Sequence, residues 1–183
     1  MKARLLSTLA AIWSVAAWGQ GTVNFCNLNP SAGLNAPMFG GDGVTKLSGP
    51  GFTAELVAGT SPSLMWEVAQ TGFLTGAGAG YFQGGVVTLP MIVPGETAFL
   101  QVRVFATSYG SFAAAQTVIK NDTWGMSSVF SVVTGGAGTP PSTPAALTGL
   151  TGFSLVMLPE PSAFSLSALG LALLLLLRAK KGR

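Results

Sequence analysis

The acidic side chains are the first candidates for chemistry, because the chain contains no histidine and only one cysteine. Without an imidazole, a Ser-His-Asp triad, a Cys-His pair and a histidine-bearing metal site are all excluded. Glu55 and Glu67 remain as carboxylates, but nothing in their spacing indicates the acid pair of a glycosidase. We expect them to be solvated positions on separate strands. The sequence therefore predicts no catalytic residue, no metal site, no cofactor and no enzyme.

Three other features could indicate binding. Asp42 lies in "GGDGV", which resembles a calcium loop only superficially, because one acid cannot supply the ligand set and a turn is expected instead. Cys26 lies in the alternating stretch "GTVNFCN" and is expected to be a small, buried apolar side chain. The aromatic residues that could form a sugar-stacking platform are Trp66, Trp124, Tyr81, Tyr109 and the phenylalanines. Core packing and ordinary surface positions explain these aromatics equally well.

The charges are concentrated at the two ends of the chain. Charged residues make up 8% of the sequence, against about 25% in typical soluble proteins, and hydrophobic residues make up 49%. Residues 20–158 carry three cations and five anions, a net charge of −2, although the whole chain has +3. The middle therefore lacks the basic patch that nucleic acid binding requires, and nucleic acid is not an expected partner. The length of 183 residues favours one domain.

The middle of the chain has the pattern of an all-β protein. Short alternating runs bounded by glycine and proline turns predict strands at 22–28, 51–59, 64–70, 84–90, 97–106, 127–135 and 152–158. In 97–106, Leu100, Val102 and Val104 share one face, while Gln101 and Arg103 point the other way. This is typical of half-buried antiparallel strands, so an antiparallel β-sandwich or jelly roll is expected.

Three stretches do not read as strands. Residues 113–118, "AAAQTV", are consistent with a helical turn. Residues 71–85 are glycine-rich and predict either a long loop or a strand weakened by glycine. Residues 134–149, and 135–146 in particular, are rich in Gly, Pro and Thr and predict a linker or a long surface connection. Beyond them, 152–158 is expected to return to the body.

The N-terminus has the pattern of a secretory signal over residues 1–19. Lys2 and Arg4 precede the apolar run "LLSTLAAIWSVAA", which is short for a membrane span. Small side chains then follow, so we predict a signal helix with cleavage between Gly19 and Gln20. Cleavage after Ala17 is the second choice, and an uncleaved N-terminal anchor is the alternative.

The C-terminus has three parts in a fixed order. Glu160 lies between Pro159 and Pro161, and no charge occurs from Pro161 to Leu177, a run of 17 residues. The basic cluster that follows is Arg178, Lys180, Lys181 and Arg183. We predict a transmembrane helix over 162–177, with the cluster in the cytoplasm and the body outside. A helix N-terminus explains Pro161 and partly explains Glu160, but it does not explain Pro159.

The segment "LPEPSAFSLSALGLALLLLLRAKKGR" resembles the PEP-CTERM sorting signal of Gram-negative bacteria, over roughly residues 157–183. The resemblance implies recognition of Pro159, Glu160 and Pro161 by an exosortase, a membrane-embedded cysteine peptidase that processes such anchors. It also implies that the four C-terminal cations act as a stop-transfer signal. Leu158 matches the family, whereas Ala163 stands where a Thr often follows Ser.

The body is similar to small exported proteins of verrucomicrobial type through "GTVNF", "GVTKLSGPGFTAELVAG" and "TGAGAGYFQGG". No activity comes with that likeness. We therefore expect a non-enzymatic envelope or extracellular-matrix protein over residues 20–158, anchored in the inner membrane through 159–183 and then processed. A carbohydrate- or polymer-binding module on the same anchor is the alternative, with exopolysaccharide as a further expected partner.

Overall fold

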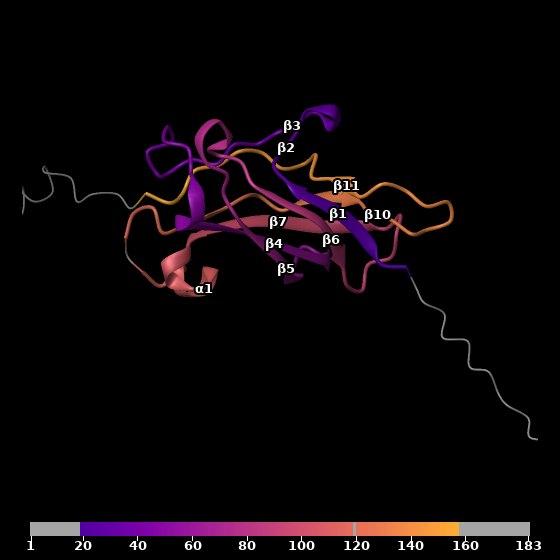
Figure 1. Cartoon of the computed structure of the whole chain (residues 1–183). Helices are drawn as coiled ribbons and strands as arrows, with labels where there is room; N and C mark the ends of the chain where they lie inside the picture. The colour runs from indigo at the N-terminus through magenta and orange to yellow at the C-terminus, as the bar shows by residue number, and fades with distance from the viewer. Residues whose placement is uncertain (1–18, 119, 158–183) are drawn as a thin grey trace, which may run out of the picture.

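The computed structural model of the chain describes residues 19–118 and 120–157 (Figure 1). In this part of the chain nearly all regular structure is strand, and the α-helix is the short α1 (Phe112–Gln116). The expected all-β class is confirmed. The predicted N-terminal signal helix and C-terminal transmembrane helix lie outside the described residues.

The larger sheet has the strand order β5-β4-β7-β8, and β9 also pairs with β7. Its strands are β4 (Phe52–Ser61), β5 (Leu64–Gly72), β7 (Thr97–Ala106), β8 (Trp124–Met126) and β9 (Phe130–Val133). All of these pairs are antiparallel, and the register places Leu56 opposite Val102 and Glu55 opposite Arg103. The central strands β4 and β7 therefore fix which side chains can meet across this sheet.

The second sheet is built around β1 (Gly21–Cys26). β1 runs antiparallel to β6 (Gln83–Leu89) and β10 (Gly135–Gly136), and parallel to β11 (Ala145–Ala146). The expectation of a purely antiparallel body is thus corrected by one short parallel pair. A small hairpin of β2 (Leu28–Asn29) and β3 (Leu34–Asn35) continues from β1.

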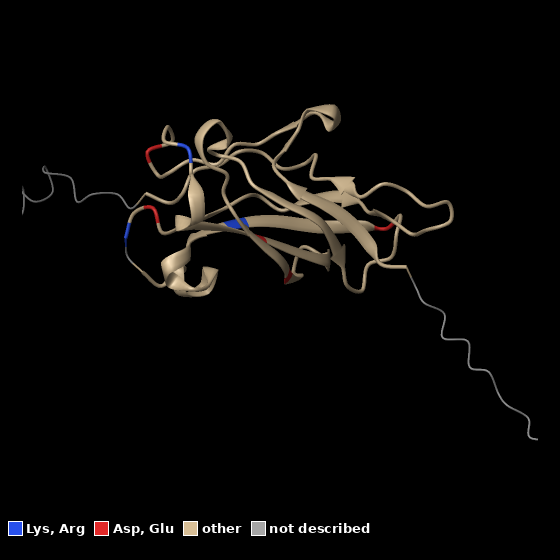
Figure 2. Ribbon diagram, in the orientation of Figure 1, with Lys and Arg blue, Asp and Glu red and all other residues tan. Residues whose placement is uncertain are grey.

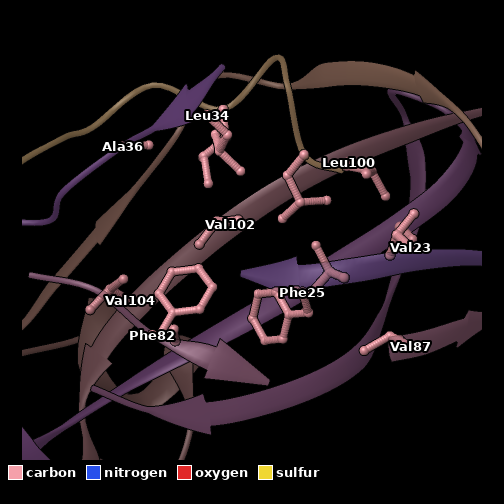
Figure 3. Close-up of a cluster of buried hydrophobic side chains, with 14 of the residues drawn as sticks. Val23, Phe25, Leu34, Ala36, Phe82, Val87, Leu100, Val102 and Val104 are labelled. Carbon is pink, nitrogen blue, oxygen red and sulfur yellow. The ribbon is translucent and has the colours of Figure 1, made fainter. Parts of the chain in front are cut away.

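The two sheets share one hydrophobic core (Figure 3). Val23 and Phe25 of β1 meet Val102 and Val104 of β7 there, and all four side chains have no exposed surface. The ring of Phe82 lies 4.8 Å from that of Phe25, between centroids. The alternation of apolar residues in 97–106 therefore identified the core-facing side of the larger sheet.

Most of the predicted elements are confirmed. The strands expected at 22–28, 51–59, 64–70, 84–90 and 97–106 correspond to β1, β4, β5, β6 and β7. The strand expected at 127–135 is divided between β9 and β10. The helical turn at 113–118 is α1, whose N-cap residue Ser111 accepts a hydrogen bond from the Ala114 amide on its side-chain oxygen.

The outer face of the larger sheet differs from the expected polar, solvated surface. Glu55 is 4% exposed, Val57 is 1% exposed and Gln101 is 8% exposed. α1 lies over this side, and Phe112 brings its ring within 5.1 Å of the Arg103 guanidinium carbon. The middle of β4 and β7 is therefore covered on both faces, which the alternation did not predict.

The glycine-rich stretches connect strands without separating domains. Residues 73–82 form a loop with a 3-10 turn at Gly76–Gly78, while the two ends of the glycine-rich stretch 71–85 belong to β5 and β6. Both ends of 135–146 pair with β1, so this stretch is a surface connection and not a linker. Gly135 is needed there, because a Cβ atom would come within 1.8 Å of the Thr143 carbonyl oxygen.

The last described residues return to the body, as expected for 152–158. The Leu155 amide donates to the Phe39 carbonyl, and the Val156 amide donates to the Trp124 carbonyl. The pairing is an isolated bridge between Ser154 and Phe39, not a full strand.

Candidate functional site

The most connected polar cluster lies on the outer face of the larger sheet. An oxygen of Glu55 on β4 is 3.6 Å from a terminal guanidinium nitrogen of Arg103 on β7. Gln70 on β5 donates to the other Glu55 oxygen at 3.2 Å. Arg103 also donates to Gln101 at 3.1 Å, and Gln101 donates to the Ser127 carbonyl at 3.0 Å. The cluster thus joins the neighbouring strands β5, β4 and β7.

Burial raises the pKa of the Glu55 carboxyl above its ordinary value, and the nearby Glu67 carboxylate raises it further. The hydrogen bond from Gln70 and the charge of Arg103 oppose this shift. The expectation that both acids are solvated on separate strands is therefore wrong for Glu55, while Glu67 is exposed as expected. Both oxygens of Glu55 have internal partners, so this carboxylate connects strands.

A cavity of about 320 Å³ opens beside this cluster, between the sheet and α1. Glu55, Glu67 and Arg103 lie on the sheet side, whereas Ser111 and Gln116 lie beside or on α1. Its lining carries two carboxylates and one guanidinium, and the guanidinium is paired with Glu55. We call it the charged cavity.

The turn around Asp42 is confirmed as a turn. Asp42 accepts hydrogen bonds from the Val44 and Thr45 amides at 2.9 and 2.8 Å, and from the Thr45 hydroxyl. These bonds lower the pKa of its carboxyl, the Thr45 hydroxyl having the largest effect. Asp122 comes close and accepts from the Gly41 amide. Residues 19–118 and 120–157 contain no group of three or more metal-ligating side chains.

Cys26 is 5% exposed, which agrees with the predicted buried side chain, and burial raises the pKa of its thiol. The aromatic residues do not form one platform. Trp124 packs edge-on against Phe112 at 5.7 Å between ring centroids, and Tyr109 packs on the same small cluster. Trp66 lies on β5 opposite Ala58. Tyr81 borders a cavity.

That second cavity, of about 360 Å³, lies between the strand β1 and the loop 74–83. The polar side chains that line it are Asn24, Asn29, Tyr81 and Gln83. None of its lining residues carries a charge, so we call it the uncharged cavity. Figure 2 shows that the charged residues of the body lie mainly on the larger sheet and on the turns at 42–46 and 120–122.

Sequence reasoning missed the uncharged cavity, because its residues come from segments far apart in the chain. The available signal was partial. Asn24, Cys26 and Leu28 have a period of two and therefore share one side of β1 and its continuation. Nothing in the sequence placed Tyr81 and Gln83 beside them.

Of the predicted processing residues, the structure describes Gly19 and Gln20. Gly19 is half-buried and Gln20 is exposed, immediately before β1. The other predicted residues lie outside the described part of the chain: Pro159, Glu160, Pro161, Arg178, Lys180, Lys181 and Arg183. Among the residues that are described, no helix has the length and apolar character needed to cross a membrane.

Comparison with known proteins returns no match to a family, to a curated protein or to a solved structure. The site is therefore interpreted from its own residues.

Proposed function

We propose that the protein is a non-enzymatic, exported β-rich protein that reaches the cell envelope or extracellular matrix through a PEP-CTERM sorting signal. In this proposal residues 1–19 direct export, and residues 162–177 hold the chain in the inner membrane with the body outside. An exosortase then processes the chain near Pro159, Glu160 and Pro161.

The observation that carries the proposal is the three-part C-terminal order. A Pro-Glu-Pro motif, an uncharged run and the basic cluster 178–183 follow one another without interruption. A helix N-terminus accounts for Pro161, but it gives no reason for Pro159. Two prolines around Glu160 favour an extended backbone, which a peptidase can bind more readily than a helix.

The fold supports the proposed boundaries. Gly21, the first residue of β1, donates its amide to the Ile92 carbonyl at 2.7 Å, so the first strand of the described residues begins just after Gln20. At the other end, Val156 is still bonded to Trp124. Cleavage at both proposed positions would leave the two sheets and their core intact. The two ends of the body also lie at opposite ends of the molecule (Figure 1), so a C-terminal anchor would hold the start of β1 away from the membrane.

We also infer that the two sheets, which face each other across one hydrophobic core, form a β-sandwich. It combines a hairpin of consecutive strands, β4 and β5, with a long return that brings β10 and β11 back beside β1.

The test replaces Glu160 with Gln in a host that contains an exosortase. The substitution keeps the shape of the side chain and removes its charge, and any lost interaction with a helix dipole is only about 0.3–1 kcal/mol. Anchoring should therefore survive, while processing should fail and the full-length chain should accumulate in the inner membrane. A blot against a tag in the body, with mass spectrometry of the mature N-terminus at Gln20, measures both ends.

Glu96→Gln is the matched control, because Glu96 is an exposed acid of the body. It should be processed as the unmodified chain is. Equal processing of Glu160→Gln and Glu96→Gln would reject recognition through Glu160 and leave residues 159–183 as a simple anchor.

A further inference from the structure

The uncharged cavity lies on the outer side of the sheet that contains β1, away from the shared core. Asn24 and Cys26 of β1 and Leu28 of β2 lie along one side of it. Cys26 is 5% exposed and its raised pKa keeps the thiol neutral, so it adds no charge to the site. The opposite wall is the loop 74–83, which includes Leu74 and Tyr81.

The polar groups of this cavity are amides, and they are only partly used inside the protein. The side chains of Asn24 and Gln83 have no hydrogen-bond partner among the described residues. Asn29 accepts one bond, from the Ser31 hydroxyl at 2.7 Å, which leaves its two N–H donors free of that contact. Each of these amides can both donate and accept. The wall therefore presents paired donors and acceptors without a formal charge.

Tyr81 is held in place from two sides. Its hydroxyl donates to the side-chain oxygen of Asn35 at 2.8 Å, and the Lys46 ammonium lies 5.4 Å from the ring centroid. Because these contacts already hold the Tyr81 side chain in place, less side-chain entropy is lost when a ligand binds. The apolar side chains near it, Leu28 and Leu74, are 42% and 43% exposed. An apolar surface next to unpaired amides can contact both the C–H face and the hydroxyls of one ligand.

The wall itself is fixed by a buried asparagine. Asn27 is fully buried, and its amide donates to the Ala36 and Gly80 carbonyls at 2.7 and 2.9 Å. The Phe82 amide donates to the Asn27 side-chain oxygen at 2.7 Å. These three bonds tie the residues on either side of Tyr81 to the β2–β3 hairpin. The cavity is therefore preformed and does not depend on a mobile loop.

We propose that the uncharged cavity binds a neutral sugar unit, supplied in the envelope by an extracellular polysaccharide. The volume of about 360 Å³ is at the small end of the roughly 300–1,000 Å³ of small-molecule sites, which suits a short saccharide segment. The identity of the source as an envelope polysaccharide rests on the proposed export. The sugar binding rests on the cavity alone.

Two other ligand classes fit this lining less well. A hydrocarbon chain would bury the amides of Asn24 and Gln83 without partners, and each such amide costs about 1–3 kcal/mol. An anionic sugar would find no cationic side chain among the lining residues. A sugar with neutral hydroxyls satisfies the amides and stacks its C–H face on Tyr81 and the leucines.

The test measures binding of neutral hexasaccharides to the full chain, purified in a detergent without a sugar headgroup. Cello-, laminari-, xylo- and manno-hexaose are titrated, with hexagalacturonate as the anionic comparison, and binding is followed by ligand-observed saturation-transfer NMR. At least one neutral sugar should bind in preference to hexagalacturonate. Tyr81→Ala should weaken that binding about tenfold, and Gln83→Ala about threefold or more.

Gln83 is exposed and no side-chain contact of it holds the fold, so Gln83→Ala keeps the test valid if Tyr81→Ala does not fold. Glu67→Gln in the charged cavity is the matched control and should leave the sugar affinity unchanged. The proposal is overturned if no neutral hexasaccharide binds, if hexagalacturonate binds best, or if Gln83→Ala and Glu67→Gln have equal effects. Processing of the chain in cells is measured separately, so failure here leaves the sorting proposal standing.

Discussion

The outer faces of the two sheets differ in how their polar side chains are hydrogen-bonded. On the larger sheet α1 packs against β7 and β8, and Glu55 of β4 is bonded within the protein to Arg103 and Gln70. On the sheet around β1 the loop 74–83 forms the cover, and the cavity beneath it carries amides without internal partners. The polar groups on the larger sheet therefore join strands, while those on the sheet around β1 are available to bind a ligand.

The difference shows which polar side chains are suited to bind a ligand. A buried charge needs partners from within the protein, because leaving it alone is costly, and those partners then occupy its oxygens. A neutral amide at a partly open position can exchange bonds between water and a ligand at little cost. The charged residues that line the charged cavity are easy to single out in the sequence. The uncharged cavity, however, has more hydrogen-bonding groups that lack a partner within the protein.

Replacing Asn27 with Ala should have the largest effect, because it removes the attachment of the loop that makes the uncharged cavity. The Ala36 carbonyl and the Phe82 amide lose their buried partner, whereas the Gly80 carbonyl keeps its bond from the Met38 amide. Each of the two unpaired groups costs about 1–3 kcal/mol and the third lost bond about 1 kcal/mol, so we expect a loss of about 3 kcal/mol or more in the free energy of unfolding. Urea denaturation of the full chain measures it.

Asn35→Ala provides the comparison. Asn35 is exposed and lies on β3 of the same hairpin, but its side chain bonds only the Tyr81 hydroxyl. Its replacement should cost less than about 1 kcal/mol. Equal losses for the two variants would mean that the Asn27 bonds do not hold the loop.

The second prediction concerns the ion pair of the charged cluster, which a substitution of Arg103 removes. Arg103→Met keeps the length of the side chain but leaves Glu55 without its cation. Removing one partner of a fully buried pair costs about 3–5 kcal/mol, and the Arg103 side chain is 30% exposed, so about 2 kcal/mol is expected near neutral pH. Urea denaturation measures this loss, and Lys120→Met, at an exposed cation, should show little change.

The pH dependence of Arg103→Met has a defined sign. The pKa of Glu55 is already above the ordinary 4.5 in the folded protein, and it should rise further without Arg103. A folded-state pKa that is raised gives stability below the unfolded value and loses it as the pH rises through the folded value. The variant should therefore lose more stability near neutral pH than at about pH 4. An equal loss at both values would show that packing, not charge, causes the effect.

The core and most strands could be predicted because they depend on local alternation. Leu100, Val102 and Val104 share a face in sequence and are fully buried in the core. The burial of Glu55 could not be predicted in this way, since its partners Gln70 and Arg103 lie on other strands and the cavity beside it is bordered by α1, more than fifty residues later in the chain. The same holds for 135–146, whose glycines and prolines are typical of a linker but whose two ends pair with β1.

The two polar sites also differ in how far the sequence could predict them. Opposite charges on the outward faces of two adjacent predicted strands could suggest a Glu55–Arg103 pair, once β4 and β7 are known to be neighbours. The uncharged cavity offers no such signal, because Asn24 and Tyr81 meet through a loop whose path is fixed by the buried side chain of Asn27. The uncharged cavity is thus formed by the tertiary hydrogen bonds of Asn27, and the periodicity of the sequence could not predict these bonds.

The smallest expected effect separates the two causes that raise the pKa of Glu55. Glu67→Gln removes a like charge and leaves the burial of Glu55 unchanged, so the pKa of Glu55 should fall but stay above its ordinary value. Because the folded-state pKa falls, less stability is lost as the pH rises, and the variant should gain about 0.3 kcal/mol near neutral pH. Carbon-detected NMR titration of the Glu55 carboxyl follows the pKa, and Glu96→Gln should leave it unchanged. If the pKa of Glu55 does not move in Glu67→Gln, burial alone raises it.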